Sequence, residues 1–279
     1  MNEPQGSVPI IQTVQAAYGF FVSHWLRAVP AALIAGLAGA VLAYPSMAAP
    51  GSITPGLAFL SLVAGLAGFV VYQAALYRLA LRPEDAGQFG VSFGSDELRL
   101  AGVIAALGLF VILVAIVAIF PLMLVVMSVA ASDVGLEAIE SASISADTNF
   151  ISLLGPAAGA IYIIGMIAIV ALVVWVNVRL SLAMAATIAE RRFVLLAAWG
   201  WTKGSALRIF AALVLALLPL FLPLVLVQSL LAPQIAAAGT GAVIVSFVIQ
   251  FISSATMGVV GAGLYAYLYK GLRPPRETA

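Results

Sequence analysis

The sequence contains no cysteine and only one histidine, His24, in 279 residues. Without cysteine the chain cannot form a disulfide or a thiolate metal site, and one imidazole cannot build a histidine cluster for zinc or iron. The sequence also has no Walker loop and no H-E-x-x-H helix, which carry nucleotide and zinc chemistry in other proteins. We therefore expect no metal site, no cofactor, no nucleic-acid partner and no enzymatic activity.

Charge is scarce as well, because only 8% of the residues are charged and 64% are hydrophobic. An ordinary soluble domain is roughly 45–50% apolar. Residues 28–77 and 209–269 contain no Asp, Glu, Lys, Arg or His. A helix crosses the bilayer core with about 20 apolar residues, so these runs predict an all-α, polytopic integral membrane protein.

The longest charge-free run must fold back on itself. Residues 209–269 would make one helix of about 90 Å, three times the hydrocarbon core of about 30 Å. Proline and glycine mark turns at residues 44–56 and 232–241. With two further apolar runs, the sequence predicts six transmembrane helices in three hairpins, at about 28–45, 57–78, 100–130, 151–178, 209–231 and 243–269.

All twelve Lys and Arg residues lie on one side of this predicted topology. The ionisable residues in the loops on the opposite side are all acidic, and they are Asp133, Glu137, Glu140 and Asp147. Cytoplasmic loops of membrane proteins are enriched in Lys and Arg. We therefore expect a multi-pass protein of the bacterial inner membrane with both termini in the cytoplasm.

Residues 179–208 are too charged to enter lipid and too apolar to leave it. The segment contains Leu180, Leu182, Trp199 and Trp201 between its cations. An amphipathic helix in the headgroup plane buries such apolar side chains while Lys and Arg reach phosphates. We expect short cytoplasmic interfacial helices here, broken at Gly200 and Gly204, and a second interfacial helix at residues 10–25.

The residues on the cytoplasmic side supply the candidate site. Acids and bases there either pair into a network or leave cations to bind anionic headgroups, each worth about 1 kcal/mol near the surface. The candidates for binding lipid or a partner protein are Arg78, Arg82, Arg99, Arg179, Arg191, Arg192, Trp199, Trp201, Lys203 and Arg208. The candidates for a charge network are Asp96, Glu97 and Glu190.

Polar residues within the spans are few. Gln250, Ser253 and Ser254 lie near one face of the last span, beside Gly258 and Gly261. They could line a pathway, but small and polar residues also permit close helix packing with interhelical hydrogen bonds, which we favour. No ionisable residue lies in the middle of a span, where coupled carriers keep their ion sites.

Three features of the chain resemble a known family. They are the six-span plan, "RLSLAMAATIAERRFVLLAAWGWTKGSALRI" at 179–209 and "YLYKGLR" at 267–273, together with "FGSDELRL" at 93–100. They resemble the bacterial membrane domain fused to glycerophosphoryl diester phosphodiesterases and its stand-alone relatives. The resemblance covers nearly the whole chain, brings no catalytic residues with it, and leaves no room for the phosphodiesterase domain.

The sequence thus favours a non-enzymatic membrane protein whose cytoplasmic face binds anionic lipid or a partner protein, with a homo-oligomer left open. The alternative is a carrier of lipid or of a small apolar solute. A continuous polar cavity reaching the middle of the membrane would favour the carrier. A bundle without such a cavity would favour the lipid-binding or scaffold protein.

Overall fold

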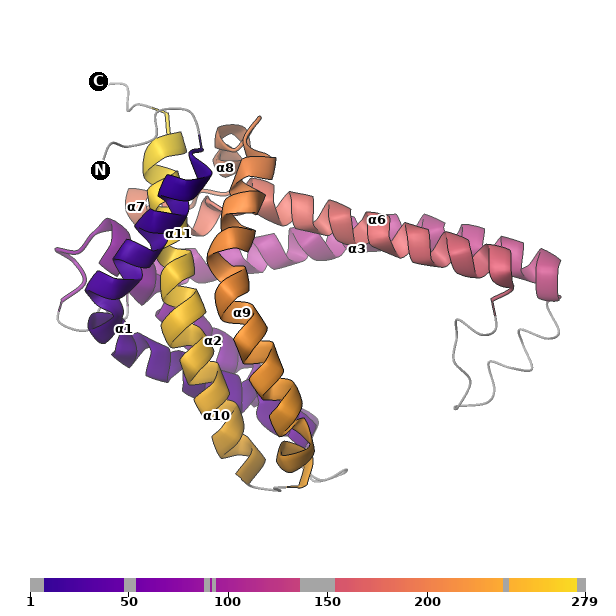
Figure 1. Cartoon of the computed structure of the whole chain (residues 1–279), viewed down its shortest axis with the longest axis horizontal. Coiled ribbons are helices and arrows are strands. Elements are labelled where there is room, and N and C mark those ends of the chain that lie inside the picture. The colour runs from indigo at the N-terminus through magenta and orange to yellow at the C-terminus, as the bar shows by residue number, and fades with distance from the viewer. Residues whose placement is uncertain are drawn as a thin grey trace. The chain divides into compact units, whose positions relative to one another are not determined.

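The computed structural model describes residues 8–47, 54–87, 91, 94–135, 154–237 and 241–274. Within these ranges every regular element is a helix (Figure 1). The prediction of an all-α fold with six spans is confirmed. The helical stretches long and apolar enough to cross a membrane are Ile10–Pro45, Pro55–Leu81, Ser95–Ser132, Pro156–Glu190, Ala206–Leu231 and Gly241–Leu272.

The chain folds as two compact units. The first comprises Met1–Ala105 and Arg179–Ala279, and the second comprises Ala106–Val178. The first unit contains every residue of the candidate site. Its long helices are α1 (Ile10–Met47), α2 (Pro55–Leu81), α9 (Ala206–Ala237), α10 (Gly241–Ser253) and α11 (Val259–Leu272).

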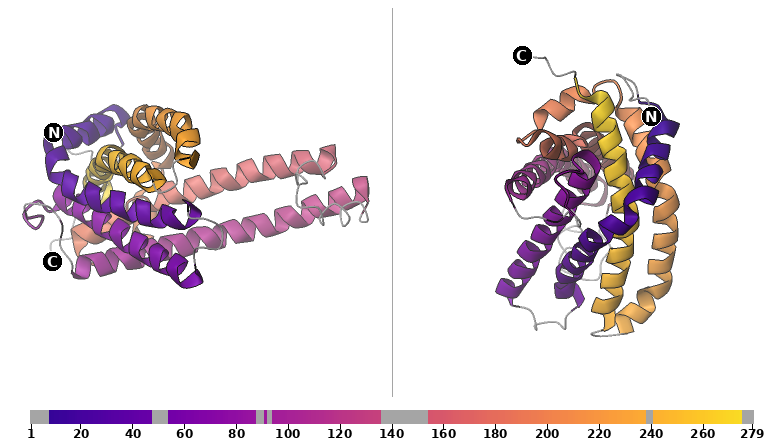
Figure 2. Two further views of the ribbon diagram at one scale, coloured as in Figure 1. Left: turned by 90° about the horizontal axis from the view of Figure 1, so that it is seen from below. Right: turned by 90° about the vertical axis from the view of Figure 1, so that its left-hand side faces the viewer.

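Helix α1 packs against all the other long helices of the first unit (Figures 1 and 2). Glycines allow this close approach. A Cβ atom on Gly39 would lie 2.2 Å from Cγ of Gln250, and one on Gly65 would lie 2.1 Å from Cγ of Leu42. Small residues at helix contacts are typical of membrane bundles, where dispersion between closely packed backbones replaces the hydrophobic effect.

The predicted separate helix at residues 10–25 does not occur. Helix α1 runs without interruption from Ile10 to Met47. Pro30 lies inside it, and a proline removes one backbone hydrogen bond without ending the helix, which accounts for the bend of α1 in Figures 1 and 2. The buried face of its N-terminal part contains Thr13 and Ala17, and Tyr18 donates to the carbonyl oxygen of Ala216 at 2.9 Å. The depth of this segment in a membrane stays a prediction.

The second unit is a helical hairpin. It is formed by the greater part of α3 (Ser95–Val134) and of α6 (Pro156–Leu180), which lie side by side in Figure 2. Val126, Ala130, Leu154 and Ala158 form its buried core. The acidic loop that the sequence places between these helices lies outside the described residues, apart from its first part.

The segment between α6 and α9 differs from the prediction. It contains α7 (Ala183–Glu190) and α8 (Leu196–Trp201). Leu182, Ala186 and Ile188 are fully buried, and α7 contacts α2 and α11. Its alanine-rich sequence lets it pack closely against these helices, so its apolar residues leave water by contacting protein. The location of α7 at the membrane surface stays a prediction, but its apolar residues are covered by protein and not by lipid.

The breaks in this segment also differ in part. Gly204 has a φ of +79° and lies in the turn before α9, as predicted. Gly200, however, lies inside α8. The first break comes at Arg191, whose φ of 54° ends α7 in the left-handed conformation. A residue other than glycine, such as Arg191, is uncommon in that conformation.

The last span contains a π-helical turn, η1 (Ser254–Gly258), between α10 and α11. The Tyr72 hydroxyl donates to the carbonyl oxygen of Ser254 at 2.7 Å, and a Cβ atom on Gly258 would lie 1.5 Å from that hydroxyl. Gln250 Nε2 lies 3.4 Å from Oγ of Ser254. These contacts support the packing interpretation of the polar residues in this span. The turn gives Tyr72 both a carbonyl acceptor and the room it needs.

Candidate functional site

The candidate site begins where α2 ends and α3 begins. Arg78 lies in the last turn of α2, whereas Asp96 and Glu97 lie in the first turn of α3. Cations are favourable at the C-terminus of a helix and anions at the N-terminus, because the peptide dipoles align. Glu97 Oε2 also accepts the backbone N–H of Gly94 at 2.9 Å, which is one half of a capping box.

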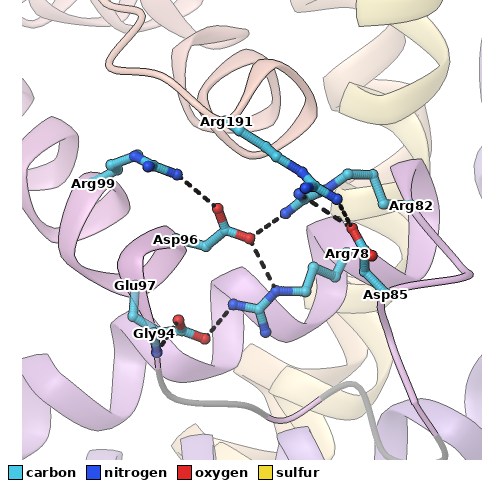
Figure 3. A network of polar contacts seen from close by, with 8 residues as sticks. All are labelled: Arg78, Arg82, Asp85, Gly94, Asp96, Glu97, Arg99 and Arg191. Atoms are coloured by element: carbon cyan, nitrogen blue, oxygen red, sulfur yellow. Dashed lines mark hydrogen bonds and ion pairs between the residues drawn. The ribbon is translucent and has the colours of Figure 1, made fainter.

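Asp96 is the centre of the ion-pair network (Figure 3). Its Oδ2 accepts Arg78 Nε at 3.3 Å and also accepts Arg82 Nη2. Its Oδ1 accepts Arg99 Nη1 at 3.3 Å. Arg78 Nη2 donates in turn to Oε1 of Glu97. The network therefore joins the C-terminal end of α2 to the N-terminal end of α3.

Burial decides which arginines can meet a ligand from outside. Arg78 and Arg82 are only 3% and 8% exposed. A buried cation that loses its carboxylate partner is strongly destabilising, so these two arginines are tied to their acids. Arg78 and Arg82, which the sequence offered as binding lipid or a partner protein, are thus paired with carboxylates and are not on the exposed surface, and their part in binding stays a prediction.

Asp85 extends the network to the loop after α7. Its Oδ2 lies 3.2 Å from Arg82 Nη1 and 2.6 Å from Arg191 Nη2. Asp85 was not among the predicted residues. Its position three residues after Arg82 is the signal that could have identified it, since the two lie within reach across one turn.

Glu190 has partners of its own outside this network. Its Oε2 accepts Arg192 Nε at 2.7 Å, and its Oε1 accepts the Tyr269 hydroxyl at 3.2 Å. These contacts fix the C-terminal end of α7 to α11. The structure therefore places Glu190 in an ion pair, as predicted, but not with Asp96 and Glu97.

Arg179 and the two tryptophans of α8 pack against protein. The guanidinium of Arg179 lies 4.8 Å from the Trp199 ring centroid, and the Thr202 hydroxyl donates to the Arg179 carbonyl oxygen at 2.8 Å. The Trp201 and Tyr269 rings lie 6.0 Å apart. Both tryptophans remain half-buried, so each still presents part of its ring at the surface.

The exposed cations are the remaining members of the predicted set. The side chains of Arg191 and Arg192 are 61% and 70% exposed. Lys203 and Arg208 are exposed too, and neither has an ion-pair partner among the residues that the structure describes. These four residues surround α8 in the sequence, and we refer to them as the exposed cations.

A cavity of about 380 Å³ lies within the network. Its wall carries four arginines and two carboxylates, which suits an anion and not a metal ion. Within the described ranges, no group of three or more His, Asp or Glu side chains could hold a metal. The cavity is lined by Arg78, Arg82, Asp85, Ser95, Asp96, Arg99 and Arg191.

A second cavity of about 350 Å³ lies between α1, α2 and α10. Its wall is mostly apolar, and Tyr72 and Gln250 are its two polar side chains. Tyr72 donates its hydroxyl hydrogen to Ser254, as described above. This cavity is therefore not lined by a continuous set of polar groups.

Residues 90–94, GVSFG, match the spacing of the G-x-S-x-G turn of serine hydrolases. That turn activates serine when it follows a strand and lies beside a histidine base. The described residues contain no strand, and Ser92 lies outside them. His24 Nδ1 instead lies 2.7 Å from Oγ of Ser23. We assign the pattern no catalytic role.

No family model, curated protein or solved structure matches this chain. The resemblance to the membrane domain of glycerophosphoryl diester phosphodiesterases stays a prediction.

Proposed function

We propose that the protein is a non-enzymatic protein of the bacterial inner membrane whose cytoplasmic face binds anionic lipid headgroups through its exposed cations. Two features of the chain support the orientation. An even number of spans places both termini on one side, and all twelve Lys and Arg residues lie on that same side of the predicted topology. The positive-inside rule makes this side the cytoplasm.

The observation that carries the proposal is the division of the basic residues. Arg78 and Arg82 are buried in ion pairs, whereas the exposed cations surround a short helix with two half-buried tryptophans. Tryptophan favours headgroup depth, and long cationic side chains reach lipid phosphates. The exposed cations are thus the groups that anionic lipid can contact.

A role without catalysis fits the state of the ionisable groups. The acids of the network each accept hydrogen bonds from one or more arginines, so they are engaged in ion pairs. A partner protein with an acidic surface would use the same exposed cations. Lipid is the simpler ligand because these residues lie at the ends of membrane-spanning helices.

The carrier stays the second candidate because of the apolar cavity between α1, α2 and α10. Its lining suits an acyl chain or a small apolar solute with one polar group, which Gln250 could bind. Transport would require this cavity to open to both sides in turn. A flux of labelled lipid between the leaflets of proteoliposomes, abolished by Gln250→Leu, would favour the carrier.

The proposal is tested by lipid enrichment in nanodiscs made from phosphatidylglycerol and phosphatidylcholine. Lys203→Gln with Arg208→Gln should weaken phosphatidylglycerol enrichment roughly thirtyfold, because each of the two cations contributes about 1 kcal/mol. The matched control is Lys203→Arg with Arg208→Lys, which keeps both charges and should behave as the parent protein. Equal enrichment in the neutral variant would contradict lipid binding by these residues.

A further inference from the structure

We infer that the arginine-lined cavity between α2, α3 and the loop after α7 binds one phosphate ester group. The inference deepens the proposed function and rests on it for the source of the ligand, a lipid headgroup at the cytoplasmic surface. The exposed cations attract several headgroups weakly, whereas the cavity would bind a single headgroup.

The charge around the cavity calls for an anion. Four arginines line it, namely Arg78, Arg82, Arg99 and Arg191. They pair with three carboxylates, those of Asp85, Asp96 and Glu97. One positive charge is therefore left over. A phosphodiester carries one negative charge at neutral pH and would balance it.

Hydrogen-bond donors remain for such a group. Arg82 Nε has no hydrogen-bond partner in the described part of the protein, but it has almost no accessible surface, so the donors that a ligand can reach are those of Arg99 and Arg191. A guanidinium has five N–H donors. Arg99 uses only Nη1 and Arg191 only Nη2 in their ion pairs, so each has donors left. Phosphate oxygens accept such donors in pairs, with a geometry that matches the planar guanidinium.

The cavity also lies at the positive end of a long helix. Ser95, which lines it, is the first residue of the 40-residue helix α3. The first turn of a helix offers backbone N–H groups and a favourable dipole to an anion. The Ser95 hydroxyl adds a further donor at this end.

The existing ion pairs prepare the cavity for its ligand. Asp96 holds Arg78, Arg82 and Arg99 around one carboxylate, and Asp85 holds Arg191 against Arg82 (Figure 3). Arginines already fixed in position lose little conformational freedom when an anion arrives. Arg99 and Arg191 are 36% and 61% exposed, so the ligand can enter between them.

The test compares Arg99→Gln and Arg191→Gln with Lys270→Gln as the control. Lys270 is an exposed cation in the last turn of α11, but it does not line the cavity and is not one of the four exposed cations that we propose to bind lipid. Native mass spectrometry counts the phosphatidylglycerol molecules retained by each variant in a neutral detergent. Titration with inorganic phosphate, followed by thermal shift, tests the free anion.

We expect the parent protein to retain one phosphatidylglycerol per chain. Arg99→Gln and Arg191→Gln should each weaken this binding about tenfold or more, since each removes charge-assisted hydrogen bonds. Lys270→Gln should leave it within about twofold of the parent value. If inorganic phosphate binds with the same dependence on Arg99 while phosphatidylglycerol does not, the cavity is a site for a free phosphate group, and only the lipid source is wrong.

Two results would overturn the inference. One is equal weakening by Lys270→Gln, which would show that attraction to the whole basic surface explains the retained lipid and would leave the proposed function intact. The other is the absence of binding of both phosphatidylglycerol and phosphate to the parent protein. Should Arg191→Gln fail to fold, Arg99→Gln alone decides, because Arg99 lies on the exposed side of a regular helix.

Discussion

Arg78 at the end of α2 and Glu97 at the start of α3 form an ion pair in which the side chains are 3% and 9% exposed. Arg78 also reaches Asp96, so two acids share one buried cation. The pair lies between helices that follow each other in the chain, and it fixes how the second span ends and how the third begins.

Replacing Glu97 by Gln should lower the free energy of unfolding by about 3 kcal/mol, because it removes one of the two carboxylates that neutralise the buried Arg78. The measurement is chemical unfolding in mild detergent. Glu84→Gln, at an exposed position with no ion pair in the described residues, is the control and should change stability by less than about 0.5 kcal/mol. Equal effects of the two changes would mean that the buried pair does not stabilise the fold.

Gly258→Ala should be strongly destabilising, because the new Cβ would lie 1.5 Å from the Tyr72 hydroxyl and 2.7 Å from Cζ. Adding Tyr72→Phe should recover part of the loss by removing the closest atom. Gly261→Ala is the matched control, since a Cβ there meets nothing within 4 Å and alanine favours the helix by about 0.5–1 kcal/mol. Thermal unfolding of the three variants separates these cases. A harmless Gly258→Ala would contradict the close contact at η1.

Single cysteines can distinguish α7 from α8, because the chain has no cysteine of its own. A thiol at Ala186, which is fully buried, should resist a water-soluble maleimide in the folded protein. A thiol at Leu196, which is 73% exposed, should react, and a fluorophore there should be quenched by labels at headgroup depth. Similar reactivity at both positions would contradict the burial of α7 against protein.

The orientation of the six spans is open to direct measurement. Reporter fusions should show alternation, because each span reverses the side of the chain and the basic residues all belong to one side. A reporter found on the opposite side at any one position would contradict the predicted hairpin that contains it. The periplasmic positions are 50, 140 and 236, and the cytoplasmic positions are 88, 195 and 276.

The spans could be predicted from the sequence because the bilayer allows few solutions. A backbone in hydrocarbon must satisfy its hydrogen bonds internally, so long charge-free runs become helices whatever their neighbours. The ends of the helices were harder to predict. Helix α9 continues past Pro233 to Ala237, where a turn was expected, and α1 continues through Pro30. A proline removes one hydrogen bond, and helices tolerate that loss with a bend.

The contacts within the site required tertiary structure. The sequence placed Asp96, Glu97 and several arginines on one side of the membrane, but it could not tell buried Arg78 from exposed Arg192. It also could not predict that α7 packs on protein, since apolar periodicity is the same whether a helix faces lipid or a neighbouring helix. The π-helical turn depends on Tyr72, which is 182 residues away from Ser254 in the chain.

The central claim is that the exposed cations attract the anionic lipids that gather around the protein. The most direct measurement is phosphatidylglycerol enrichment around the parent protein in nanodiscs as salt rises from about 0.1 M to about 1 M, which shortens the Debye length from about 10 Å to about 3 Å. We predict that enrichment falls to the level of the Lys203→Gln, Arg208→Gln variant, apart from one lipid held in the cavity. Enrichment that is independent of salt and equal in both proteins would contradict the claim.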